Sequence, residues 1–503
     1  MAIAPPRGKA LDELRFANSF ASLGGAFSER RTPTGIPGAR LVSFSPEAGA
    51  LIDLRAGEER RLEFAELVAG NALLDGMEPV AGMYGGHQFG VWAGQLGDGR
   101  AILLGEVPAP STDDERDAAP GKRREPVDTW ELQIKGGGLT AFSRFADGRA
   151  VVRSTVREFL ASEAMHHLGV PTTRALAMAA GDEPVLRERV ERAATVIRMA
   201  PTFVRFGSFE IFHYRKQHER VRTLADYVID RFYPECGDEA DRYARFFTAV
   251  VERTAALMAH WQAVGFAHGV MNTDNFSILG LTLDYGPYGF VEEYEPGFIC
   301  NHSDESGRYA FDRQPTIGLW NCYALAEALS SLISKDEIEA ALARYEHVYR
   351  ATFLALLRAK LGVLDARDDD ADLALELFRM LEARRIDWTN FWRALSHDDA
   401  TALTLLGDDE SSRAWLERYA RRVVDDPRGD DERRAAMRVV NPKYVLRNWV
   451  AQEAIAACEA GDDSVVNAVL DVLRAPFDEH PNREAWAHPA PAQYRGLSVS
   501  CSS

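Results

Sequence analysis

The segment with the most chemistry lies between His268 and Asp284, where Asn and Asp side chains gather around a short apolar stretch. Asn275 follows His268 by seven residues, and Asp284 follows Asn275 by nine. Amide and carboxylate oxygens are ligands that Mg²⁺ takes when it bridges phosphate groups. The spacing therefore predicts a site for a metal ion and a nucleotide, with Asn275 and Asp284 as metal ligands. The alternative is a turn in which these side chains only cap backbone groups.

The order of these residues is typical of the protein-kinase catalytic loop, H-R-D-x-x-x-x-N, followed by D-F-G. One position departs from that pattern, because Val270 stands where the loop has its catalytic base and valine cannot accept a proton. Asp274, next to Asn275, is the carboxylate that could replace it. We therefore expect a site for a metal and a nucleotide, and Val270 argues against an orthodox kinase.

A strand lysine is the second chemical feature. Trp130 to Lys135 alternates as a strand does, and only seven of the 58 basic residues are lysines. Kinases hold nucleotide phosphates with a strand lysine that a glutamate on the following helix fixes in place. Lys135 and Glu158 match these positions. Glu158 also fits a capping box with Thr155, so a purely structural role stays open.

Two glycine-containing turns could bring backbone amides close to an anion. One lies between Gly94 and Arg100, and the other comes shortly after Lys135. Each is weak evidence alone, since many such turns only reverse the chain. The candidate ligand-binding residues in these turns are Gly97, Gly99, Arg100, Asp147 and Gly148.

Two arginines, Arg198 and Arg205, lie in a largely apolar stretch. Burying a guanidinium is costly unless it is paired. A bound polyphosphate would satisfy both side chains, and pairing with a carboxylate of the protein is the alternative.

The elements that must position these residues divide the chain into a strand-rich first part and a helical second part, hence an α+β fold. We expect four regions: an N-terminal extension (1–80), a strand-rich lobe (81–212), a lobe with the catalytic and metal loops (213–330) and a helical C-terminal region (331–503). The expected strands are 101–106, 130–135, 196–199 and 203–206, and the expected helices include 61–74, 154–168 and 240–264.

Composition excludes several classes of protein. The 503 residues carry a formal net charge of −18, which argues against a nucleic-acid binder that works by bulk charge. Five cysteines without a CxxC pair predict neither a disulfide scaffold nor structural zinc. No secretory signal or apolar stretch of about 18 residues is present, so we expect a cytoplasmic protein that does not span a membrane.

Taken together, these motifs resemble the selenoprotein O family, the protein adenylyltransferase pseudokinases. The resemblance is spread over most of the chain and is far more specific than a kinase-like loop alone. The matching runs are Gly94 to Glu106, Glu131 to Val170, Arg198 to Phe212, His268 to Tyr294, Cys300 to Leu319 and Ser500 to Ser503.

The resemblance implies a two-lobed, protein-kinase-like fold with extra C-terminal helices that holds ATP in an inverted orientation. AMP would pass to Ser, Thr or Tyr hydroxyls of proteins, with pyrophosphate released. It also implies that Asp274 is the proton acceptor, that Asn275 and Asp284 bind Mg²⁺ or Mn²⁺, and that Glu158 supports Lys135. The residues implied to hold ATP are Gly97, Gly99, Arg100, Lys135, Asp147, Gly148, Arg198, Arg205 and Asp284.

The same resemblance carries a redox theme, because family members often have selenocysteine near the C-terminus, where Cys501 stands here. A regulatory disulfide between Cys300 and Cys501 is one hypothesis, and two unconnected thiols are the alternative. UTP as a second donor, giving UMP transfer, stays open. The competing functions are an orthodox kinase for a protein or small molecule and a non-catalytic nucleotide-binding redox sensor. We expect a monomer.

Overall fold

The computed structural model describes residues 8–110, 129–424, 426–494 and 497. Its centre is an eight-stranded antiparallel sheet with the order β1-β3-β6-β7-β10-β9-β2, and β8 pairs with β10. The strands are β1 (Ser28–Arg30), β2 (Arg40–Phe44), β3 (Val80–Gly82), β6 (Ala101–Pro108), β7 (Thr129–Lys135), β8 (Ala150–Val151), β9 (Arg174–Leu186) and β10 (Val190–Ala200).

Register in this sheet brings two chemical side chains together. In the β7–β10 pair, Gln133 lies opposite Arg198 and Lys135 lies opposite Val196. Successive side chains of a strand point to opposite faces, so Gln133 and Lys135 share one face of β7. Gln133, Lys135 and Arg198 therefore lie close together on the paired strands β7 and β10.

Both faces of the sheet are covered. On one face α4 (Val152–His167) packs with α15 (Asn448–Glu459) and α16 (Ser464–Arg474) in the largest apolar cluster. On the other face α3 (Leu62–Val68) contributes Phe64 to a second cluster with Ile134 and Ile197. The first 82 residues thus supply three strands and a covering helix to the sheet.

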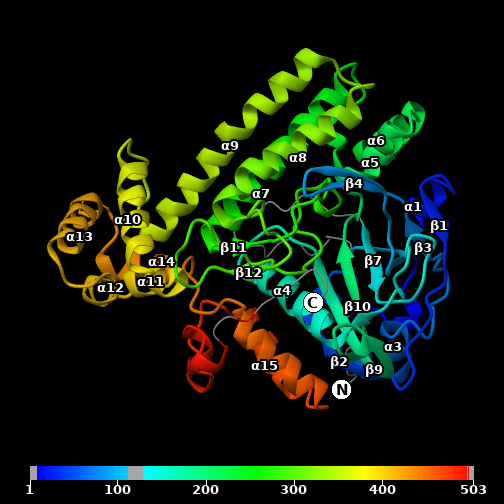
Figure 1. Ribbon diagram of the computed structural model, residues 1–503, viewed down its shortest axis with the longest axis horizontal. Helices are drawn as coiled ribbons and strands as arrows, with labels where there is room; N and C mark the ends of the chain where they lie inside the picture. The colour runs from blue at the N-terminus through cyan, green and yellow to red at the C-terminus, as the bar shows by residue number, and fades with distance from the viewer. Residues whose placement is uncertain (1–7, 111–128, 425, 495–496, 498–503) are drawn as a thin grey trace, which may run out of the picture.

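Long helices lie beside the sheet (Figure 1). Helix α7 packs against α8 and α9, and α5 packs against α8. Their bounds are α5 (Phe206–Tyr214), α6 (His218–Phe232), α7 (Arg242–Val264), α8 (Gln314–Leu329) and α9 (Lys335–Leu361). The far end of the molecule is formed by α10 (Asp370–Arg384), α11 (Trp388–Leu395), α12 (Asp399–Leu406), α13 (Glu410–Val423) and α14 (Asp430–Arg438).

The remaining elements are short. Two more strand pairs are β4 (Gly85–Gln88) with β5 (Val91–Gln95), and β11 (Phe266–Ala267) with β12 (Gly289–Phe290). The short α-helices are α1 (Ser19–Ser22) and α2 (Pro46–Ala50). The 3₁₀ helices are η1 (Leu11–Glu13), η2 (Glu58–Arg60), η4 (Pro234–Cys236), η5 (Thr273–Asn275), η6 (Phe311–Arg313), η7 (Pro481–Ala487) and η8 (Ala492–Tyr494).

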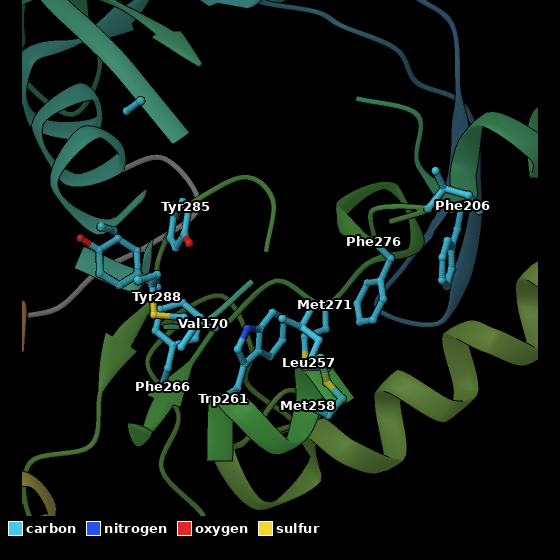
Figure 2. Packing of buried hydrophobic residues seen from close by; sticks show 14 of the residues in the cluster. Val170, Phe206, Leu257, Met258, Trp261, Phe266, Met271, Phe276, Tyr285 and Tyr288 are labelled. Atoms are coloured by element: carbon cyan, nitrogen blue, oxygen red, sulfur yellow. The ribbon is translucent and has the colours of Figure 1, made fainter. Parts of the chain in front are cut away.

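The loops after α7 are anchored by aromatic packing. Helix α7 ends at Gly265, whose φ of 72° is the left-handed conformation that closes many helices. Trp261 on its last turn then packs against Phe266 with ring centroids 5.6 Å apart, and Met271 and Phe276 join the same cluster (Figure 2). The backbone between residues 268 and 285 is therefore held in place by packing against the end of α7.

The expected α+β class is confirmed, since the described residues combine helices with an antiparallel sheet. Strands 101–106 and 130–135 and helices 154–168 and 240–264 are found within a few residues of their expected bounds. The division into four regions and the two-lobed kinase-like arrangement stay predictions.

One expectation about elements was wrong, and another gave a helix that is too long. Residues 203–206 are not a strand, because the carboxylate of Glu131 accepts from the backbone N–H of Phe203 and helix α5 begins at Phe206. The helix expected over 61–74 is confined to α3. The capping-box alternative for Glu158 also fails, since α4 begins at Val152 and Glu158 lies well inside it.

Glu131 itself leads to a prediction about stability. It is 2% exposed, and burial raises the pKa of its carboxyl from 4.5 to about 8. Between these values the folded state binds a proton that the unfolded state releases, so stability falls as pH rises from 4.5 to about 8. Glu131→Gln should remove a fall in unfolding free energy on the order of 4 kcal/mol between pH 5 and pH 8.

Urea unfolding of the wild type and the variant at pH 5 and pH 8 would measure this difference. The exposed Glu63→Gln should leave the pH dependence of the wild type unchanged. An equal fall in the unfolding free energy of wild type and Glu131→Gln would contradict the assignment.

Candidate functional site

His268 ties the loop of residues 268–275, which corresponds in order to the kinase catalytic loop, to the loop that carries Asp284. His268 is 1% exposed, its ring stacks on Trp261, and its Nε2 donates to the backbone oxygen of Leu283 at 2.8 Å. Burial lowers the pKa of His268, so the ring is neutral at pH 7. It fixes the spacing of the two loops and has no free role as an acid or base.

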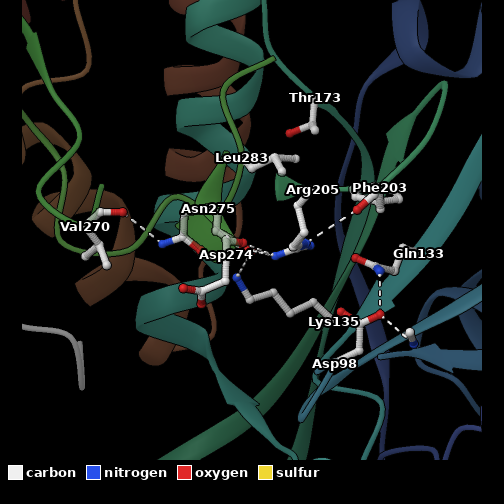
Figure 3. A network of polar contacts seen from close by, with 12 residues as sticks. Asp98, Gln133, Lys135, Thr173, Phe203, Arg205, Val270, Asp274, Asn275 and Leu283 are labelled. Carbon is white, nitrogen blue, oxygen red and sulfur yellow. Dashed lines mark hydrogen bonds and ion pairs between the residues drawn. The ribbon is translucent and has the colours of Figure 1, made fainter. Parts of the chain in front are cut away.

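Asn275 ends the short 3₁₀ helix η5 in this loop. Its Nδ2 donates to the backbone oxygen of Val270 at 2.9 Å, which fixes the amide plane (Figure 3). The amide oxygen is then the atom that Asn275 can offer to a cation. Val270 contributes this backbone oxygen and its backbone N–H, which donates to His268 Nδ1 at 3.3 Å.

Asp284 lies among three cations. Its Oδ2 is 2.8 Å from Arg205 Nη1, its Oδ1 is 3.2 Å from Lys135 Nζ, and Oδ1 also accepts from Arg198. Burial alone would raise the pKa of Asp284, but the charges of Arg198, Lys135 and Arg205 outweigh it and hold the pKa well below its usual value. Asp284 is therefore ionised at any pH near neutrality.

Glu158 supports the cations from the helix side. Its Oε2 is 2.7 Å from Lys135 Nζ, and its Oε1 accepts from Arg198 Nη1 at 2.9 Å. Gln133 Oε1 accepts from the second guanidinium nitrogen of Arg198. The expected ion pair of Lys135 with Glu158 is thus present, while its use in holding phosphate stays a prediction.

Arg205 joins the two loops. It is 2% exposed, and its Nη1 donates to the backbone oxygen of Asp274 at 2.8 Å (Figure 3). The same Nη1 donates to the carboxylate of Asp284, also at 2.8 Å. The guanidinium also lies 4.5 Å from the ring centroid of Tyr84. The cation cluster, defined as Lys135, Arg198 and Arg205, therefore sits where both loops meet the sheet.

Asp274 differs from Asp284 in its surroundings. It is 8% exposed, and among the described residues its Oδ1 has no hydrogen-bond partner. Its Oδ2 accepts from Gln88 Nε2 at 3.4 Å. Burial raises the pKa of Asp274 to about 7, although Arg205 opposes the shift. A carboxyl with a pKa near 7 is suited to accept and release a proton.

The first glycine turn packs tightly against another loop. A Cβ at Gly97 would lie 2.5 Å from the Phe142 ring, and one at Gly99 would lie 2.9 Å from the Phe142 backbone oxygen. The structure thus explains both glycines by packing, and their contact with nucleotide stays a prediction. Arg100 is exposed, makes no ion pair with another described residue, and acts electrostatically on Lys135.

Asp147 and Gly148 are not joined to the cation cluster by any contact among the described residues. Asp147 pairs with Arg187 at 2.7 Å and accepts from the backbone N–H of Arg149. Gly148 has a φ of 74°, and a Cβ there would lie 2.3 Å from the Gly138 backbone oxygen. Their role in ATP binding stays a prediction.

Sequence reasoning missed several residues of the site. Gln133 binds Arg198, and Asp98, 6% exposed, accepts from Gln133 Nε2 at 3.3 Å and from the Gly82 backbone N–H at 2.9 Å. The alternation of β7 could have identified Gln133, because it lies two residues before Lys135 on the same face. The contacts of Tyr84 and Gln88 gave no such signal.

Cys300 is 8% exposed, its thiol donates to the Ala267 backbone oxygen at 3.4 Å, and burial raises the pKa of the thiol to about 12. Cys501 lies outside the described residues, so the pairing of these cysteines stays a prediction. The described residues contain no cluster of three or more His, Cys, Asp or Glu arranged as a metal site. Nor does any described helix have the length and apolar character needed to cross a membrane.

Comparison with known proteins places the chain in one family of protein nucleotidyltransferases. The family model described as protein adenylyltransferase SelO matches residues 10–474. A protein nucleotidyltransferase YdiU of Myxococcus xanthus (strain DK1622) is 54% identical over 500 residues, which cover 98% of this chain and 99% of that protein. Proteins of the same name from Thioalkalivibrio sulfidiphilus and Thiobacillus denitrificans are 51% and 49% identical, again over 98% of this chain and 99% of theirs.

Proposed function

Because the chain belongs to the protein adenylyltransferase SelO family, we propose that it transfers AMP from ATP to Ser, Thr or Tyr hydroxyls of proteins. The observation that carries this proposal is the convergence of Lys135, Arg198 and Arg205 on Asp284, beside a buried Asp274. Val270, at the position of the kinase base, favours a transfer other than that of the γ-phosphate. UTP as an alternative donor, with UMP transferred, belongs to the same proposal.

The cation cluster would bind the triphosphate. Guanidinium groups form paired, charge-assisted hydrogen bonds with phosphate oxygens, and Lys135 adds a point charge. Arg198 and Arg205 are buried cations beyond the lysine that kinases use, as an inverted triphosphate with a deep γ-phosphate would require. The remaining residues proposed to contact ATP are Gly97, Gly99, Arg100, Asp147 and Gly148.

Asn275 and Asp284 would hold Mg²⁺ or Mn²⁺. The donors fit, because the Asn275 amide is fixed by Val270 and the low pKa of Asp284 keeps its carboxylate ionised. Two protein oxygens are few, but Mg²⁺ commonly takes one or two protein ligands together with phosphate oxygens and water. The metal would neutralise charge that develops on the α-phosphate and on the departing pyrophosphate.

Asp274 would take the proton of the acceptor hydroxyl. The new bond joins the hydroxyl oxygen to the α-phosphorus, the bond from this phosphorus to the β-phosphate bridge breaks, and pyrophosphate leaves with the electron pair. The free Oδ1 of Asp274 is the atom that would receive the proton. Arg205 holds the backbone of Asp274 in place for this step.

A two-lobed, kinase-like arrangement is part of the proposal, with the sheet and α4 in one lobe and the loops after α7 in the other. The ion pair of Lys135 with the α4 residue Glu158 supports it, since kinases join their strand lysine and helix glutamate in this way. A cytoplasmic location and a monomeric state are expectations from the sequence alone.

Position-labelled ATP separates the candidate functions. A lysate incubated with the protein and ATP labelled on the α-phosphate should yield labelled proteins, whereas ATP labelled on the γ-phosphate should not. Label from the γ-phosphate would identify an orthodox kinase. Nucleotide binding without transfer of either label would favour a redox sensor that lacks catalysis.

Lys135→Ala should raise the KM for ATP about 10- to 100-fold, because the variant loses a buried charge that contacts phosphate. Steady-state kinetics over a range of ATP concentrations would measure the change. Lys335→Ala removes an exposed lysine of α9 and should leave the KM for ATP unchanged. Equal kinetics in both variants would mean that Lys135 does not contact the nucleotide.

A further inference from the structure

The hairpin formed by β4 and β5 lies against the catalytic loop. The backbone N–H of His87 donates to Thr273 Oγ1 at 2.7 Å, and that of Phe89 donates to Asn272 Oδ1 at 3.1 Å. These two acceptors are the residues directly before Asp274. The hairpin therefore fixes the backbone of the two residues before Asp274, although about 185 residues separate the two segments in the sequence.

The turn of this hairpin has an unfavourable backbone conformation at Phe89, and contacts with the neighbouring loops stabilise it. Phe89 and Gly90 have φ values of 51° and 82°, as a two-residue type I′ turn requires. A bulky residue with positive φ is costly. Phe89 is held there by its bond to Asn272 and by stacking on Tyr309, with ring centroids 5.1 Å apart.

The opposite face of β4 packs on the helices. His87 Nδ1 lies 2.5 Å from Glu210 Oε1 on α5, and the His87 ring contacts Trp92 and Trp320, the latter on α8. These contacts fix the position of the hairpin on the helices, so the other face of β4 keeps a fixed distance from Asp274.

That other face carries Gly86 and Gln88, which share it because they are two residues apart on one strand. A Cβ at Gly86 would lie 2.8 Å from Asp274 Oδ1. Gln88 Nε2 donates to the second oxygen, Oδ2, at 3.4 Å. One carboxylate oxygen is thus held by an amide, and the other, buried and without a partner among the described residues, faces a backbone that carries no side chain.

We propose that Gly86 and Gln88 position Asp274 for the proton transfer: Gln88 holds Oδ2, and Gly86, which has no side chain, lets β4 lie directly against the carboxylate and fixes its orientation. This proposal rests on the function proposed above for Asp274. The hydroxyl proton passes to Oδ1 as the oxygen bonds to the α-phosphorus and pyrophosphate leaves. Gln88 is a positioning residue, since it touches the base and not the reacting atoms.

The test compares Gly86→Ala and Gln88→Ala, with dephosphorylated casein as a hydroxyl-rich acceptor and ATP labelled on the α-phosphate. Gly86 is not among the glycines with positive φ, so the backbone permits alanine, but its Cβ would lie 2.8 Å from Asp274 Oδ1 and displace the carboxylate. Gly86→Ala should lower kcat/KM for casein at least about tenfold, and Gln88→Ala should lower kcat about tenfold. The Kd for ATP, from calorimetry, should change less than about twofold in either variant.

Matched controls are available on the chain. Val91→Ala changes an exposed residue of β5 on the same hairpin, and Gly25→Ala has open space around its Cβ. Both should transfer label as the wild type does. Wild-type rates in Gly86→Ala and Gln88→Ala would overturn the positioning role of these two residues while leaving the proposed function intact. Absence of label on casein with the wild type would count against the proposed function, and against the positioning role with it.

Discussion

Asp284→Asn is expected to lower the kcat of AMP transfer by at least about 10³-fold, the largest effect of any single change in the site. Asn keeps the size of the side chain but removes the charge that faces Lys135, Arg198 and Arg205. It would also remove the ionised ligand of the metal. The metal is expected to supply several kcal/mol of charge stabilisation in the transition state, and this would be lost with it. Initial rates over a titration of Mg²⁺ would measure the loss.

Two controls make this result specific. Asp312→Asn changes an exposed aspartate and should keep full activity. A thermal melt of Asp284→Asn would check its folding, because the substitution leaves three buried cations with less negative charge. Full activity in a folded Asp284→Asn variant would refute the assignment of Asp284 as a metal ligand.

Asp274→Asn is expected to have the second largest effect, a fall in kcat of about 10²- to 10⁴-fold, the usual contribution of a general base. The loss should be smaller than for Asp284, because positioning and charge stabilisation dominate phosphoryl transfer. The backbone oxygen of Asp274 still accepts from Arg205 in this variant, so the cation cluster keeps its place. The Kd for ATP should therefore match that of the wild type.

Single-turnover rates and calorimetric ATP binding would separate these two quantities. A variant with normal ATP affinity and a slow chemical step would agree with a base at Asp274. Wild-type turnover in Asp274→Asn would require another proton acceptor, and weaker ATP binding with unchanged turnover would assign Asp274 to the nucleotide.

Local pattern in the sequence was enough to predict the core elements of the site. The alternation of residues 130–135 identified β7, and the amphipathic pattern of 240–264 identified α7, which leads into the catalytic loop. Kinase-like order along the chain then placed Lys135 near Glu158, and the two side chains are 2.7 Å apart. These predictions succeed because periodicity and motif spacing are local properties.

Contacts between distant segments could not be predicted in this way. No local pattern predicted that the hairpin of β4 and β5 contacts Thr273, because this bond spans 186 residues. Helix α16 returns to the sheet, where Asn467 Nδ2 donates to the Val42 backbone oxygen 425 residues away. Tertiary contact also overrode local pattern at residues 203–206, where Glu131 takes the N–H of Phe203.

The mass of the modified acceptor tests the central claim most directly. A target protein incubated with ATP, Mg²⁺ and the wild type would be digested, and the mass added to its Ser, Thr or Tyr residues would be measured. The account predicts an added adenylyl group, present with the wild type and absent with Asp284→Asn. An added phosphoryl group, or an adenylyl group that persists in the folded Asp284→Asn variant, would contradict it.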